Sequence, residues 1–108
     1  MIKKILLFLA LFTCSSFAST INLALSANVS YAIEAIKKEF SLLYPDVRVK
    51  VIVSSSGKLT AQIKNGAPYD VFMSANMKYP EALYSDGLAL SKPLVYAQGS
   101  LAYLSVKK

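Results

Sequence analysis

The sequence predicts an α/β fold built on a parallel sheet, and two observations lead to that prediction. β-Rich runs alternate along the chain with segments whose apolar residues recur at helical spacing. This alternation favours parallel strands joined by crossover helices. In addition, a short polar segment follows each of the first three predicted strands. Ligands bind in such folds beyond the carboxyl ends of the strands, so these segments are the first places to search for a site.

The first half of the chain contains two predicted strands around one helix. A strand is expected over residues 21–25 and a helix over residues 31–44. Five apolar residues at helical spacing predict the buried face of that helix: Ala32, Ile33, Ile36, Phe40 and Leu43. Valines at alternate positions over residues 47–53 then predict a strand whose intervening charged residues face solvent.

The second half continues the alternation. A helix is expected over residues 59–65, with Leu59 and Ile63 facing inward. A compact buried strand is expected over residues 70–74, and a third helix over residues 79–85. Two further strands are expected near the C-terminus, over residues 92–97 and 101–106.

The N-terminus has the pattern of a secretory signal peptide. Lys3 and Lys4 precede an apolar run over residues 5–12, and small residues precede a cut after Ala18. The apolar run is too short to cross a bilayer. We therefore expect residues 1–18 to direct export to the periplasm and to be removed.

Cys14 raises a minor alternative, which is a lipid-anchored protein. Phe12 and Thr13 are bulkier than lipoprotein processing usually accepts, so cleavage after Ala18 is preferred. The product then has no cysteine and no disulfide. Histidine is absent from the whole chain, which excludes histidine-based zinc sites and catalytic Ser-His-Asp or Cys-His groups.

The net charge of +6 falls to +4 when Lys3 and Lys4 are removed with the signal peptide. The remaining lysines are scattered along the chain. A nucleic-acid-binding protein would concentrate them on one face beside aromatic residues, so no nucleic-acid partner is expected.

Polar segments at residues 26–30, 54–57 and 74–76 follow the first three strands. The first two also precede helices, where unpaired amides and the helix dipole favour an anion. Ordinary roles compete with this interpretation. Asn28 and Ser30 also suit plain helix caps, and the serines suit a solvated loop.

Two short motifs suggest enzymes and are set aside. Ser55 and Lys58 have the spacing of the nucleophile motif of penicillin-recognising enzymes, but the partner motifs of those enzymes are missing. Gly57-Lys58 is similar to part of a phosphate-binding loop, yet the first glycine and the following hydroxyl are absent. We expect no enzymatic activity.

Residues 51–76 resemble the periplasmic molybdate-binding proteins of bacterial ABC uptake systems. A serine-rich loop, Leu-x-x-Gln-Ile, Gly-Ala-Pro-x-Asp-Val-Phe and Ser-Ala follow one another in the order typical of that family. The resemblance implies a type II periplasmic solute-binding fold with two lobes. It makes residues 19–108 an incomplete N-terminal part, mostly lobe one, with residues 103–108 starting the crossover to lobe two.

The resemblance also implies a function. The expected ligand is a tetrahedral oxyanion, molybdate or tungstate, which a monomeric protein without a cofactor delivers to a membrane ABC permease. Asn28 and Ser56 match the oxyanion ligands, with Ala27 and Ser55 as backbone donors, and molybdenum is held only within the oxyanion. The alternatives are a relative that binds sulfate, phosphate or an iron complex, and a truncated fragment that binds nothing.

The signal-peptide interpretation predicts that the exported protein begins at Ser19. The intact mass of the periplasmic product measures this directly. A product that begins at a lipid-modified Cys14, or one that retains Met1, would contradict the prediction.

Overall fold

A computed structural model describes residues 18–106. The expected signal peptide, except for Ala18, and the last two lysines lie outside the described residues, as does Cys14. The elements in chain order are β1 (Ser19–Ser26), the 3-10 helix η1 (Ala27–Val29), α2 (Ile33–Leu43), β2 (Val47–Ser54), α3 (Ser56–Lys64), β3 (Val71–Met73) and α4 (Lys78–Ser85). The alternation of strand and helix confirms the predicted α/β fold.

The sheet has the order β2-β1-β3, and both pairings are parallel. Ser26 at the end of β1 lies opposite Ser54 at the end of β2. Leu25 lies opposite Met73 at the end of β3. The carboxyl ends of all three strands therefore meet at one edge of the sheet.

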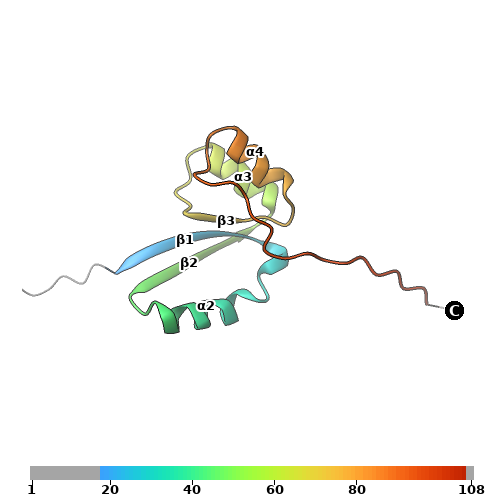
Figure 1. Cartoon of the computed structure of the whole chain (residues 1–108), viewed down its shortest axis with the longest axis horizontal. Coiled ribbons are helices and arrows are strands. Elements are labelled where there is room, and N and C mark those ends of the chain that lie inside the picture. The colour runs from blue at the N-terminus through green and yellow to red at the C-terminus, as the bar shows by residue number, and fades with distance from the viewer. Residues whose placement is uncertain (1–17, 107–108) are drawn as a thin grey trace, which may run out of the picture.

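Helices cover both faces of the sheet, with α2 on one side and α3 and α4 on the other (Figure 1). On the α2 side, Leu23, Leu25 and Ile33 form a buried core. Ala24 points to the opposite face because side chains alternate along a strand. Ala24 is fully buried there, and its small side chain leaves room for α3 to lie close to β1.

Two predictions of burial are wrong: the apolar face of α2 and the third strand are both more exposed than expected. In each case the residues lie at an edge strand of the three-stranded sheet. Ile36 and Leu43 are 50% and 74% exposed, because α2 packs mainly against the edge strand β2. The third strand is shorter than predicted, and Val71 is 46% exposed because β3 is the other edge strand.

The two strands predicted over residues 92–97 and 101–106 are absent, and this part of the prediction is wrong. The described part of this segment has no regular structure: residues 92–99 pass beside β3 without forming a strand, and the remaining residues run away from the sheet (Figure 1). Leu94, Tyr103 and Leu104 are each more than 80% exposed. A strand is stable only when a neighbour accepts its backbone hydrogen bonds, and no strand of residues 18–106 pairs with this segment.

No helix within residues 18–106 combines the length and the apolar character that a membrane span needs.

Hydrogen bonds attach the segment between α3 and β3 to β1. α3 ends at Lys64 and is capped by Asn65; Gly66 follows with a φ of +88°, a left-handed conformation that glycine adopts without strain. Asp70 then bonds Asn22 twice. The backbone N–H of Asn22 donates to Asp70 Oδ2 at 2.7 Å, and the backbone N–H of Asp70 donates to the backbone carbonyl of Asn22 at 2.9 Å. The Asn22 side chain donates to the Pro68 carbonyl at 3.1 Å, so β3 begins in a defined register.

Replacing Asp70 should therefore destabilise the fold. We expect Asp70→Ala to lower the free energy of unfolding by about 1–3 kcal/mol, because the Asn22 amide loses a charged acceptor. The matched control is Asp86→Ala, which removes an exposed ion pair with Lys64 at 3.5 Å and should cost less than about 1 kcal/mol. Urea unfolding of both variants measures the difference. Equal losses would contradict the role given to Asp70.

Candidate functional site

The candidate site lies where the three strands end. Among residues 18–106 four polar residues are buried, and three of them are at this edge: Ser26, Ser56 and Ser74. Ser26 ends β1, Ser56 is the first residue of α3, and Ser74 follows β3. A buried hydroxyl is costly unless it is hydrogen-bonded, so the partners of these serines define the local structure.

Ser56 joins the three strand ends. Its Oγ is hydrogen-bonded to Ser26 Oγ at 3.1 Å and accepts from the Ala75 amide at 3.0 Å. One side chain thereby links the end of β1, the start of α3 after β2, and the segment after β3. We call Ser26, Ser56 and Ala75 the serine junction.

The start of α3 differs from the polar loop that the sequence predicts. β2 extends to Ser54 and α3 begins at Ser56, so only Ser55 lies between the two elements. Ser55 caps the helix, because its Oγ accepts from the Lys58 amide at 3.2 Å. The first amides of a helix have no helical carbonyl to bond, and they carry the positive end of the helix dipole.

Ala27 and Asn28 lie on η1, directly after β1, and both are exposed. Neither Asn28 nor Ser30 caps α2, whose N-cap is Ala32 and has no side-chain bond. The Ser30 hydroxyl instead donates to the Ala27 carbonyl at 2.7 Å. The ordinary helix-cap role is therefore wrong for both residues.

The register brings Asn28 and Ser56 to the same edge. Ser26 and Ser54 are partners in the β1–β2 ladder, and Asn28 and Ser56 each lie two residues beyond that pair. Ala27 and Ser55 each lie one residue beyond it. The four residues singled out in the sequence thus follow two adjacent strand ends, although Asn28 is exposed and Ser56 is buried.

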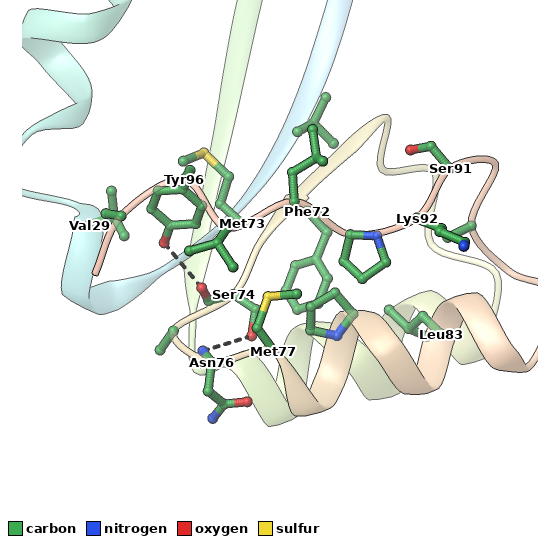
Figure 2. Close-up of a pocket in the computed structure, with 18 of the residues that line it drawn as sticks. Val29, Phe72, Met73, Ser74, Asn76, Met77, Leu83, Ser91, Lys92 and Tyr96 are labelled. Atoms are coloured by element: carbon green, nitrogen blue, oxygen red, sulfur yellow. Dashed lines mark hydrogen bonds between the residues drawn. The ribbon is translucent and has the colours of Figure 1, made fainter. Parts of the chain in front are cut away.

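A wide hollow lies beside this edge, between β3, α4 and the C-terminal segment (Figure 2). Asn28 borders it, but Ser56 does not. Its lining is mostly apolar and includes Phe72, Met73 and Met77. Tyr96 also lines the hollow, and its hydroxyl donates a hydrogen bond to the Ser74 carbonyl at 3.1 Å. An apolar lining does not suit an anion, so we place the candidate site at the serine junction and η1 rather than in the hollow.

Sequence reasoning missed Ser26 and the Ala75 amide. The signal for Ser26 was present, because it ends the first predicted strand as Ser54 ends the second. Its contact with Ser56 depends on the parallel register, which the sequence alone does not show. Asn76 has a local structural role, since its Oδ1 accepts from the backbone amide of Lys78, the first residue of α4, at 3.1 Å.

The chemistry available here is that of neutral hydrogen-bond donors. Hydroxyl, carboxamide and backbone amide groups surround the strand ends, and the junction itself contains no titratable side chain. Among residues 18–106 there is no group of three or more His, Cys, Asp or Glu side chains placed to hold a metal ion. Such a site can bind a charged acceptor by hydrogen bonds.

Comparison with known proteins gives a consistent result. The family model for bacterial extracellular solute-binding proteins matches residues 21–107. The molybdate-binding protein ModA of Azotobacter vinelandii is 33% identical over 100 residues. That match covers 90% of this chain but 38% of the relative, so the chain spans less than half the length of that protein.

Two solved structures resemble the fold. A substrate-binding domain from Clostridium difficile, assigned to a molybdenum ABC transporter, matches with a TM-score of 0.61 and 31% identity; the match covers 63% of this chain and 30% of that one. The periplasmic molybdate-binding protein of Azotobacter vinelandii matches with a TM-score of 0.59 and 36% identity, over 62% of this chain and 29% of that one.

The cap on α3 makes a prediction about stability. Ser55→Ala should lower the free energy of unfolding by about 1 kcal/mol, because the Lys58 amide loses its acceptor. Ser55→Asp is the matched control, since a carboxylate also caps a helix and should retain the stability. Thermal unfolding of the two variants measures this. A loss in Ser55→Asp as large as that in Ser55→Ala would contradict the capping role.

Proposed function

Because this chain belongs to the family of bacterial extracellular solute-binding proteins, we propose that it captures a tetrahedral oxyanion, molybdate or tungstate, in the periplasm. The bound oxyanion is a ligand rather than a cofactor, and a membrane ABC permease receives it. The observation that carries the proposal is the cluster of neutral donors at two adjacent strand ends, at the positive end of α3. The molybdate-binding relatives support the choice of ligand.

Binding replaces the water around a dianion with fixed donors. The Asn28 carboxamide and the Ser56 hydroxyl donate from side chains, and the amides of Ala27 and Ser55 donate from the backbone. Hydrogen bonds to an ionised acceptor are about twice as strong as those between neutral groups. A fully ionised oxyanion accepts at every oxygen, whereas a protonated anion presents a hydroxyl to the same donors. The site therefore favours a dianion.

The proposal needs no positive side chain at the anion. Lys58 lies in the first turn of α3 and is exposed to solvent. An exposed charge is screened by water and salt, so it adds little affinity. Fixed dipoles at a helix start hold an anion without that screening.

We propose that the protein acts as a monomer and carries out no chemistry on its ligand. Sulfate and phosphate are the main competing ligands, because they have the same tetrahedral shape. They are smaller than molybdate, so the spacing of the donors decides between them. Binding of none of the four anions corresponds to the alternative of a chain without binding activity.

Isothermal titration of the exported chain with molybdate, tungstate, sulfate and phosphate tests the function. We expect the first two anions to bind more tightly than the other two. Preference for sulfate or phosphate would overturn the choice of ligand, and the absence of binding to all four would overturn the proposed function.

Three variants test the residues. Asn28→Ala and Ser56→Ala should each weaken molybdate binding by about 1.5–3 kcal/mol, the usual cost of a hydrogen bond to a charged group. Lys58→Ala is the control and should bind nearly as well as the parent chain. If Lys58→Ala were the most damaging of the three, a site based on charge would replace the one proposed.

A further inference from the structure

We infer that Ser26 is a positioning residue for the anion site: its hydroxyl supplies the proton of the bond to Ser56 Oγ and so leaves the Ser56 proton for the anion. The inference rests on the proposed function, since it concerns how Ser56 becomes a donor to the ligand. The Oγ atoms of Ser26 and Ser56 lie 3.1 Å apart, and one proton fills the bond between them. A Ser56 hydroxyl that supplies this proton has none for a ligand.

The junction allows only a few ways to release that proton. The Ala75 amide donates to Ser56 Oγ at 3.0 Å, and a backbone amide cannot accept in return. Ser26 is different, because its hydroxyl both donates and accepts. A rotation of the two hydroxyl protons lets Ser26 donate to Ser56 with no movement of the oxygens. The Ser56 proton is then free to point at an anion.

With Ser26 as the donor, every hydrogen-bonding position of Ser56 is used. Its oxygen accepts from Ser26 and from the Ala75 amide, and its proton goes to the anion. Two donors on one hydroxyl oxygen polarise its O–H bond, which strengthens the bond that this hydroxyl donates. The contact between Ser26 and Ser56 is kept, so binding adds one bond to the charged ligand without the loss of another inside the junction.

Burial makes this arrangement a property of the fold. Ser26 and Ser56 are 4% and 7% exposed, so water has little access to compete for their protons. Ser26 ends the central strand, where it pairs with Ser54 of β2 and directly follows Leu25, the last residue of β1 that pairs with β3. A small side chain with a hydroxyl at this position therefore holds the Ser56 oxygen in place and leaves its proton mobile.

The test is a double-mutant cycle for molybdate binding, measured by titration. We expect Ser26→Ala to weaken binding about three- to tenfold, as the loss of a supporting hydrogen bond does. In a Ser56→Ala background the same change should have no further effect, because its influence passes through Ser56. Ser26→Thr keeps the hydroxyl and should restore most of the affinity.

Thr60→Val is the matched control. Thr60 is a buried hydroxyl on α3 that donates to the Ser56 carbonyl at 2.7 Å and makes no bond to Ser56 Oγ. It should lower the unfolding temperature without changing affinity, which separates loss of stability from loss of positioning. Unfolding of every variant is measured beside the titration.

The outcomes separate the two proposals. If the parent chain binds none of the four anions, both the proposed function and the role of Ser26 are overturned. If the parent binds molybdate while Ser26→Ala binds equally well or more tightly, the function stands and the role of Ser26 is overturned. An equal effect of Ser26→Ala with and without Ser56 also overturns it. A loss of affinity that requires Ser56 supports it.

Discussion

The parallel register of three strands is the constraint on which the rest of this structure depends. Parallel strands cannot be joined by tight turns, so each is followed by a connection that includes a helix. Such connections are right-handed, and the chain moves from β1 to β2 on one side and then past β1 to β3 on the other, so α2 and α3 lie on opposite faces. The shared direction of the strands brings every carboxyl end to one edge. The polar residues that follow the strands meet at this edge because all three strands run in the same direction.

The serine junction shows how a polar edge is compatible with a buried core. Leu25 is fully buried, and the next residue, Ser26, is buried as well. Its hydroxyl is satisfied by Ser56, and Ser56 is satisfied by Ser26 and the Ala75 amide. The hydrogen bonds that stabilise the three strand ends therefore involve the same atoms that are proposed to recognise the anion. Stability and binding are coupled at this edge, and a variant must be examined for both.

A neutral site also fits the distribution of charge over the described residues. The lysines are distributed along the chain, and the two ion pairs, Lys37–Glu34 on α2 and Lys64–Asp86 at the ends of α3 and α4, involve no residue of the junction. Fixed dipoles hold an anion in a defined orientation, whereas a flexible lysine holds it as a point charge. Orientation matters for a tetrahedral ligand whose competitors carry the same shape.

The sequence by itself determined the fold class, the order of the first three strands and their helices, and the residues at the strand ends. Periodicity carried that information, because helical and extended spacing are local properties. Periodicity predicted the wrong structure where an element forms only in contact with a segment distant in the sequence. Apolar alternation predicts strands beyond residue 91, but a strand forms only beside another strand, and among residues 18–106 none of these segments pairs with the outer edge of β3. Likewise the sequence indicated Ser56, but only the parallel register placed Ser26 within hydrogen-bonding distance of it, because that contact joins residues 30 positions apart.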